Sequence, residues 1–158
     1  MAHRETDLYG PVKQLLEGQG YVVKGEVGPL DVMAVRGDES PVAVELKLSF
    51  SLSLVHQGIA RQALTDHVYL AVPAGKRRDD RRNATLCRRL GLGLVRVHLP
   101  GGPCEVLCDP APYRPRRFPA RTARLLREFQ RLQGDPNTGV IIGDDSVMII
   151  EAQATPRL

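Results

Sequence analysis

The chain has 158 residues, of which 42% are hydrophobic and 25% charged, with a formal net charge of +4. This length suits one domain with a sizeable core, and no apolar stretch approaches the ~20 residues that a membrane span requires. The N-terminus lacks the apolar core of a signal peptide. Three cysteines, Cys87, Cys104 and Cys108, complete no zinc site, so we expect reduced thiols and a cytoplasmic location.

The first predicted elements are a helix over residues 7–18 and a strand over 21–26. Leu8, Val12, Leu15 and Leu16 recur at helical spacing, and glycines follow the segment. Pro11 is tolerated in a first turn but not in a helix interior, so we expect the regular helix to begin later than the apolar spacing implies.

Two apolar runs that contain charged residues predict a β-hairpin. The runs are LDVMAV (30–35) and PVAVELKL (41–48), and turn-forming residues 37–40 separate them. A turn centred near Asp38 places Asp31 opposite Glu45, with Lys47 on the same face. The opposite face is apolar, which indicates a sheet covered on both sides; it carries Val32, Ala34, Val42, Val44, Leu46 and Leu48.

The remaining predicted elements alternate between helices and short strands. We expect a helix over 52–65 with Val55, Ile59 and Ala63 inward, and a buried strand over 68–72. A helix over 80–90, with Leu86, Cys87 and Leu90 inward, precedes strands over 91–99 and 105–108. Residues 109–120 are predicted to be irregular, and a basic helix follows over 120–132. The fold class is therefore α/β, with a mixed central sheet flanked by helices.

The two opposed carboxylates of the hairpin need a compensating charge. Asp31 and Glu45 repel one another at the ~5 Å spacing of cross-strand β-carbons. A divalent cation such as Mg²⁺ or Mn²⁺ prefers hard oxygen ligands and would relieve this repulsion. The alternative is that Glu45 and Lys47 are ordinary residues of an amphipathic strand without a catalytic role, because a Glu-x-Lys tripeptide is common on such strands.

Positive charge is concentrated in the middle of the chain. Residues 76–131 hold fifteen basic and five acidic residues, a net charge near +10, and arginine supplies most of it. Arginine matches phosphate oxygens, so this density favours a nucleic acid partner. A solvated face in an arginine-rich protein is the alternative, because the chain has 18 Arg and 4 Lys.

The pattern Asp-x13-Glu-x-Lys resembles the signature of the PD-(D/E)XK nuclease superfamily at Asp31, Glu45 and Lys47. More narrowly, residues 5–138 resemble a bacterial family assigned as PD-(D/E)XK phosphodiesterases, whose physiological role is undefined. The resemblance implies a restriction-endonuclease-like αβββαβ core in a single domain over 1–138. Residues 139–158 depart from the family pattern, and we assign no role to this tail.

The resemblance also implies roles for individual residues. Asp31 and Glu45 would hold Mg²⁺ or Mn²⁺ together with the backbone carbonyl of Leu46, and Lys47 would orient or activate water. Glu5 is the best match for a further acidic ligand, in competition with Asp7 and Glu26, and Gln57 matches a polar residue beside the site. Candidate contacts to phosphate are Arg61, Lys76, Arg77, Arg78, Arg81, Arg82, Arg116 and Arg117.

The function implied is metal-dependent hydrolysis of nucleic acid, with DNA as the expected substrate and a 5′-phosphate product. A homodimer is implied only by the resemblance, because many members of the superfamily act as dimers. Two alternatives stay open at this point. One is an inactive nucleic-acid-binding module of the same fold, and the other is an adaptor whose arginine patch binds an acidic protein partner.

Overall fold

The computed structural model describes residues 2–138 and divides the chain into two compact units, one up to Arg114 and one from Pro115 onward. The tail over 139–158 lies outside the described residues. A single functional domain over 1–138 stays a prediction.

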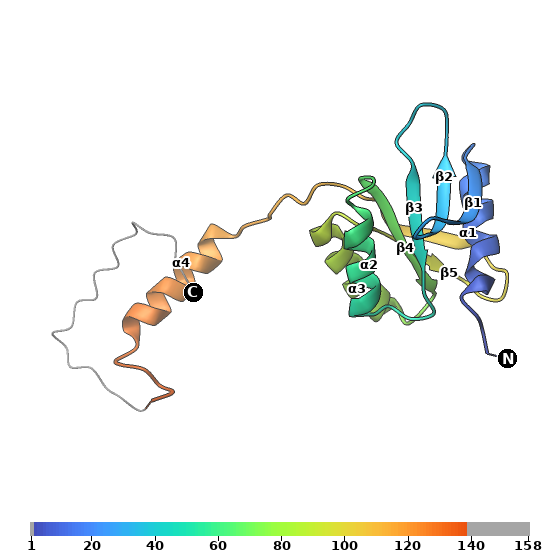
Figure 1. Cartoon of the computed structure of the whole chain (residues 1–158). Helices are drawn as coiled ribbons and strands as arrows, with labels where there is room; N and C mark the ends of the chain where they lie inside the picture. The colour runs from blue at the N-terminus through green and yellow to red at the C-terminus, as the bar shows by residue number, and fades with distance from the viewer. Residues whose placement is uncertain (1, 139–158) are drawn as a thin grey trace. The chain divides into compact units, whose positions relative to one another are not determined.

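The first unit is built on a six-stranded mixed sheet whose strands follow chain order (Figure 1). The first three strands are antiparallel, the next two run parallel to the third, and the last is antiparallel again. They are β1 (Val22–Val27), β2 (Leu30–Val35), β3 (Val42–Leu46), β4 (His67–Pro73), β5 (Gly93–Val97) and β6 (Cys104–Cys108).

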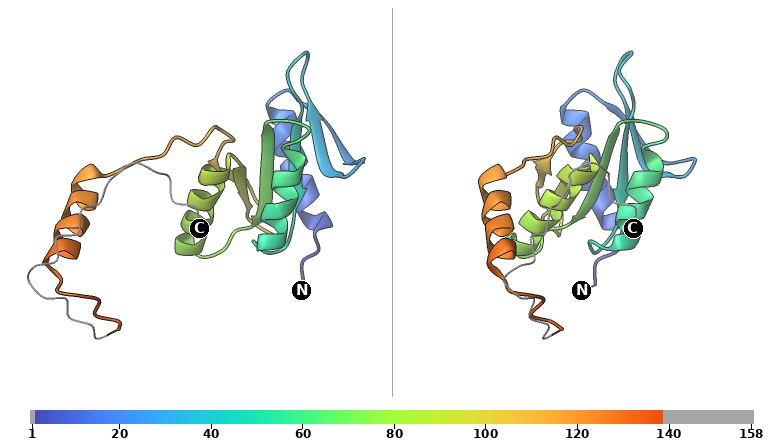
Figure 2. Two further views of the ribbon diagram at one scale, coloured as in Figure 1. Left: turned by 60° about the vertical axis from the view of Figure 1, so that its left-hand side comes forward. Right: turned by 90° about the vertical axis from the view of Figure 1, so that its left-hand side faces the viewer.

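Helices cover both faces of this sheet (Figure 2). Helix α1 (Thr6–Gly18) packs on one face, and α2 (Leu52–Arg61) and α3 (Arg77–Leu90) pack on the other. Because β3, β4 and β5 are parallel neighbours in order, right-handed crossovers bring α2 and α3 to the same face. The order α1-β1-β2-β3-α2-β4 confirms the predicted αβββαβ core.

The register of the β2–β3 hairpin also agrees with the prediction. Val32 pairs with Val44, and Met33 pairs with Ala43. The same register carried one step further sets Asp31 opposite Glu45. The apolar face of the hairpin packs against α1, except that Leu48, which the sequence places on this face, is 40% exposed. Asp31 and Glu45 lie on the opposite face, which α2 covers.

Helix α1 corrects the expectation that Pro11 delays the regular helix. The helix begins at Thr6 and contains Pro11 in its interior. Its buried residues Leu8 and Val12, both at most 1% exposed, span the proline. Burying two such side chains contributes several kcal/mol, which offsets the ~3 kcal/mol that an interior proline costs.

The inward faces of α2 and α3 agree with the prediction only in part: Val55 and Cys87 are buried and Leu90 packs against the core. Ile59 and Leu86, which the sequence places inward, are 41% and 42% exposed, and Ala63 is exposed beyond the end of α2. The cause in α2 is Gly58, which lies against the sheet: a β-carbon there would be 2.7 Å from Leu70 Cδ2. The buried face of α2 is therefore centred on Leu54, Val55 and Gly58.

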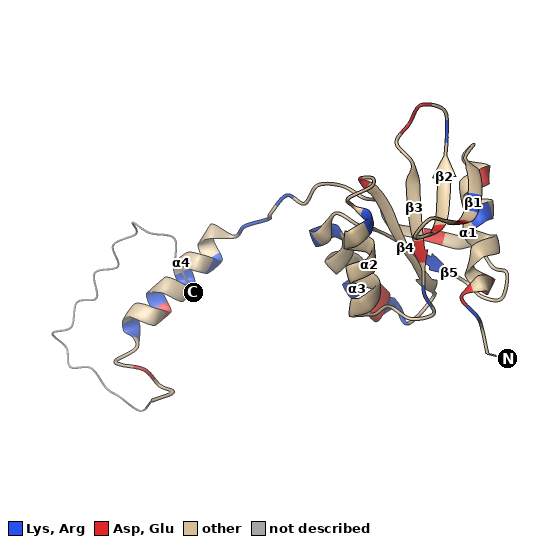
Figure 3. Cartoon of the chain, viewed as in Figure 1, with Lys and Arg blue, Asp and Glu red and all other residues tan. Residues whose placement is uncertain are grey.

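The described part of the second unit contains one helix, α4 (Pro119–Arg131). Pro119 occupies its first turn, where the missing N–H costs nothing. Arginines recur along this helix (Figure 3), and Arg121 stacks on the Phe118 ring at 4.0 Å from its centroid. Across residues 2–138, no helix has the length and apolarity needed to cross a membrane.

Candidate active site

Asp31 lies at the end of the β2–β3 pairing, one residue before Val32, and its side chain is held in place by a hydrogen bond. Its Oδ2 accepts a hydrogen bond from the Leu46 backbone N–H at 2.8 Å. The N–H and C=O of one residue in an extended strand point to the same side. The Leu46 carbonyl therefore faces β2 as well, on the side from which the Asp31 carboxylate approaches.

Glu45 is a buried carboxylate with a cationic partner. It is 2% exposed, and its Oε1 accepts a hydrogen bond from Arg61 Nε at 2.6 Å. Arg61 lies in the last turn of α2, so the pair joins this helix to the end of β3. A buried carboxylate needs such a partner, because an unpaired charge in the interior is costly.

The environment of Glu45 favours its protonated form. Burial raises the pKa of Glu45 to about 7; the Arg61 hydrogen bond opposes this rise, and the neighbouring Asp31 carboxyl adds to it. Two carboxyl groups thus lie close enough to influence each other's charge, as the hairpin register requires.

Lys47 lies one residue beyond the end of β3. Its backbone N–H donates to the Ala71 carbonyl at 3.1 Å, which continues the pairing with β4. Its ammonium group is 3.4 Å from Glu5 Oε1, and both side chains are at least one-third exposed. The ammonium therefore reaches solvent at the same end of the sheet as Asp31 and Glu45.

The three acidic candidates for a further ligand differ in position. Glu5 precedes α1 and pairs with Lys47, whereas Asp7 Oδ2 accepts the Arg4 backbone N–H at 2.7 Å. Glu26 has a left-handed φ of 54°. It lies on β1 between Gly25 and Val27, which pair with Val32 and Leu30, so it faces the position of Asp31 on β2. Within residues 2–138 no three His, Cys, Asp or Glu side chains group into a metal site.

The polar and basic candidates are distributed over several elements. Gln57 is half-buried one turn before Arg61 on α2, so both lie on one helix face. Lys76, Arg77, Arg78, Arg81 and Arg82 are exposed on and before the first turns of α3. Arg116 and Arg117 belong to the second unit, where Arg116 lies 5.3 Å from the centroid of the Phe118 ring.

Two charged contacts were not anticipated from the sequence. One is the Arg61–Glu45 pair, because the sequence assigns Arg61 to phosphate. The other is a buried ion pair in which Arg96 Nη1 is 3.0 Å from Asp80 Oδ2, which also accepts the Gly75 N–H. Arg96 in the apolar run GLVRV was the available signal, because a cation in a buried strand needs a partner.

Comparison with family models supports the resemblance found in the sequence. A model described as "Putative PD-(D/E)XK phosphodiesterase (DUF2161)" matches residues 94–150. Neither curated proteins nor solved structures gave a match. The matched segment begins within β5 and includes β6 and α4, so it does not include Asp31, Glu45 or Lys47. The six-stranded mixed sheet with its αβββαβ order is consistent with the fold of this superfamily.

Proposed function

We propose that this protein is a metal-dependent phosphodiesterase that hydrolyses nucleic acid, with DNA as the expected substrate. The observation that supports this most is the hairpin register, which sets Asp31 opposite Glu45, two residues before Lys47, in an otherwise apolar strand pair. The family match supports the reaction class independently, because it rests on a different part of the chain.

The donor set suits a hard divalent cation. Asp31 and Glu45 supply carboxylate oxygens, and the Leu46 carbonyl faces the same edge. Mg²⁺ usually binds through one or two carboxylates and keeps several water molecules, so a third acidic ligand is not required. We therefore propose Mg²⁺ or Mn²⁺ at Asp31, Glu45 and the Leu46 carbonyl, with Glu5 as a candidate outer ligand. When bound, such an ion supplies Lewis acidity toward a phosphate oxygen.

The protein groups around this position have separate tasks in the proposed reaction. The Lys47 ammonium can hold the attacking water by a hydrogen bond, and Glu5 next to it keeps the ammonium at the open end of the site. The water oxygen attacks phosphorus and gives up one proton to solvent, the bond to the 3′ oxygen breaks, and the leaving oxygen takes a proton from solvent. The 5′-phosphate product is implied by the superfamily resemblance.

Arg61 has a positioning role in this proposal. Its bond to Glu45 fixes the carboxylate in a buried place and partly compensates its charge. Gln57, one turn away on the same helix face, is proposed to contact the substrate or the attacking water. Exposed cations on and before α3 are proposed to bind the phosphate backbone, since such contacts supply most of the affinity for nucleic acids.

The test is a cleavage assay with purified protein and either Mg²⁺ or Mn²⁺. Duplex DNA, single-stranded DNA, branched DNA and RNA would each be incubated with the wild-type protein and with Asp31→Asn. We expect cleavage of at least one substrate by the wild-type protein, and its loss in the variant and in EDTA. No cleavage of any substrate, together with no metal binding, would refute the enzymatic function. An inactive binding module would instead retain nucleic acid affinity without turnover.

A further inference from the structure

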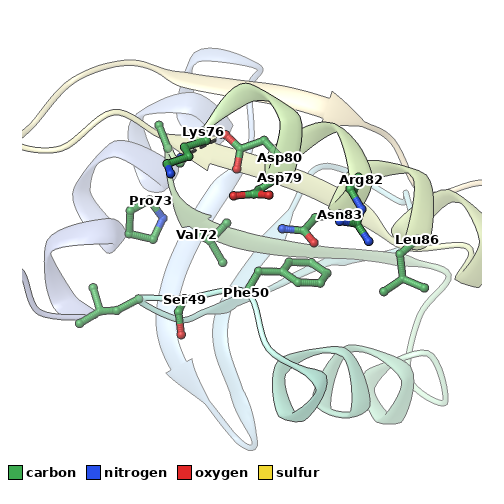
Figure 4. A pocket seen from close by; sticks show the side chains of 13 residues that line it. Ser49, Phe50, Val72, Pro73, Lys76, Asp79, Asp80, Arg82, Asn83 and Leu86 are labelled. Atoms are coloured by element: carbon green, nitrogen blue, oxygen red, sulfur yellow. Dashed lines mark hydrogen bonds between the residues drawn. The ribbon is translucent and has the colours of Figure 1, made fainter.

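A cavity of about 800 Å³ is lined in part by the residues that directly follow Lys47 in the chain (Figure 4). Its walls are residues 48–50, which follow Lys47, the end of β4 with the residues after it, and the first turns of α3. This volume lies within the ~300–1,000 Å³ typical of small-molecule sites. Lys76 and Arg82 in its lining are candidate phosphate contacts, but the cavity itself has no role in the proposed reaction.

The cavity lies within one nucleotide's reach of the proposed reaction centre. Leu48, Ser49 and Phe50 are one to three residues beyond Lys47, a distance of at most ~10 Å along an extended chain. On the other side, Leu46 pairs with Ala71, so the next β4 residues Val72 and Pro73 flank the continuation of β3. A nucleic acid strand with one phosphate at Lys47 can therefore place an adjacent nucleotide in the cavity.

The lining suits a flat polar ring better than a phosphate. The half-buried Phe50 ring forms one side, and Asp79 and Asn83, one turn apart on α3, point toward it from the facing side (Figure 4). An aromatic face can stack on a nucleobase, and the Asn83 amide both donates and accepts hydrogen bonds. The Asp79 carboxylate disfavours phosphate inside the cavity, whereas Lys76 and Arg82 line it as cations that can hold the flanking phosphates.

We propose that this cavity binds one unpaired nucleobase next to the cleaved phosphodiester. The substrate class is then single-stranded or locally unpaired nucleic acid. A base within a duplex is stacked and paired, so it cannot enter such a cavity without being extruded. The adjacency to cleavage rests on the proposed function, but the binding of an unpaired base to the cavity is tested separately.

The test measures binding by fluorescence anisotropy in EDTA at fixed low salt, so that no cleavage takes place. Three labelled probes of equal length are compared: a 12-nucleotide single strand, its duplex, and an abasic 12-mer that keeps the phosphates but lacks the bases. We expect the wild-type protein to bind the single strand about tenfold more tightly than the abasic probe, because a stacked base contributes substantially to affinity. The single strand should also bind more tightly than the duplex.

Two variants assign this preference to the cavity. Phe50→Leu keeps an apolar side chain against the core but removes the aromatic face, and Asn83→Ala removes the amide. Each should weaken single-strand binding about five- to tenfold and leave binding of the abasic probe unchanged. Thr85→Ala, an exposed position on α3 outside the cavity, is the matched control and should change nothing. Asn83→Ala alone decides the matter if Phe50→Leu does not fold.

Equal affinity for the single strand and the abasic probe would overturn the inference, as would an unchanged single-strand affinity in Asn83→Ala. Selective binding that the variants abolish, in a protein that neither cleaves any substrate nor binds metal, would support the cavity and refute the phosphodiesterase. Cleavage by a protein with no preference for unpaired bases would support the phosphodiesterase and refute the base-binding role of the cavity. The two proposals can therefore fail independently.

Discussion

Arg61 Nε donates a 2.6 Å hydrogen bond to Glu45 Oε1 and so connects the last turn of α2 to the end of β3. The contact joins a buried carboxylate to a guanidinium that remains 21% exposed on its side-chain surface. It compensates the charge that Glu45 would otherwise carry alone beside Asp31. The proton affinity of Glu45 therefore depends on a residue of the helix, and in the proposed metal site the affinity for the cation would depend on it too.

Replacing Arg61 by leucine should raise the pKa of Glu45 above about 7, because the hydrogen bond that opposes the rise is lost. A hydrogen bond to a charged group contributes roughly 1.5–3 kcal/mol, so the midpoint should move upward by about one to two pH units. Mn²⁺ titrations followed by electron paramagnetic resonance between pH 5 and 9 would measure the midpoint of metal uptake. Arg36→Leu, which breaks the exposed pair with Glu39, is the control and should leave the midpoint near pH 7. An unchanged midpoint in Arg61→Leu would contradict this account.

The metal-free protein should become less stable as pH rises, through Glu45. Its pKa rises from 4.5 in the unfolded chain to about 7 in the folded protein, so the folded state holds the proton more tightly. This contribution is fully present below pH 4.5 and is lost as pH passes through 7, a loss of about 2–3 kcal/mol between pH 5 and 8. Urea unfolding in EDTA measures this loss: the difference in free energy of unfolding between the wild-type protein and Glu45→Gln should change with pH. A difference independent of pH would show that Glu45 titrates normally.

Lys47→Ala should abolish cleavage while leaving nucleic acid binding nearly intact. The ammonium group acts on the water in the proposed reaction, and loss of such a group lowers rates by about 10²–10⁴-fold. Single-turnover cleavage and anisotropy binding would be measured on the same preparation. Lys13→Ala is a suitable control, because Lys13 forms an exposed i,i+4 pair with Glu17 on α1. A Lys47→Ala protein that cleaves at the wild-type rate would remove lysine from the mechanism.

Gly58 and Gly18 should respond in opposite directions to alanine. A β-carbon at Gly58 would lie 2.7 Å from Leu70 Cδ2 and 3.3 Å from two Leu92 atoms, whereas at Gly18, the last residue of α1, it would meet nothing within 4 Å. Overpacking costs about 1–3 kcal/mol, and alanine in a helix gains up to about 1 kcal/mol over glycine. Thermal unfolding should therefore show a lower Tm for Gly58→Ala and a higher one for Gly18→Ala. Equal shifts would mean that α2 does not approach the sheet closely at Gly58.

The hairpin could be predicted from the sequence because two local rules determine it. Strand side chains alternate faces with period two, and the turn residues between the runs set which positions face each other. The register of β2 and β3 follows from these rules alone, and with it the proximity of Asp31 and Glu45. The order of elements follows similarly from apolar periodicity, so the αβββαβ core was predictable.

The contacts between elements were not predictable in the same way. Helical periodicity gives an apolar stripe but not its exact rotation, which in α2 depends on how closely Gly58 approaches Leu70. The pairing of Arg61 with Glu45 depends on that rotation, so the sequence assigned Arg61 to the substrate instead. The cavity that follows Lys47 is formed by two segments far apart in the chain, residues 48–50 and 72–86, and no local pattern indicates it.

The proposed metal site at the end of the hairpin is central to the proposed phosphodiesterase activity. Crystals soaked in Mn²⁺ at pH 8, where Glu45 is mostly ionised, would be measured at a wavelength with strong manganese anomalous scattering. We predict an anomalous difference peak between the Asp31 and Glu45 carboxylates, within coordination distance of the Leu46 carbonyl oxygen, which disappears in Asp31→Asn crystals. A map with no peak there at saturating Mn²⁺, or with peaks only at other carboxylates, would contradict the account.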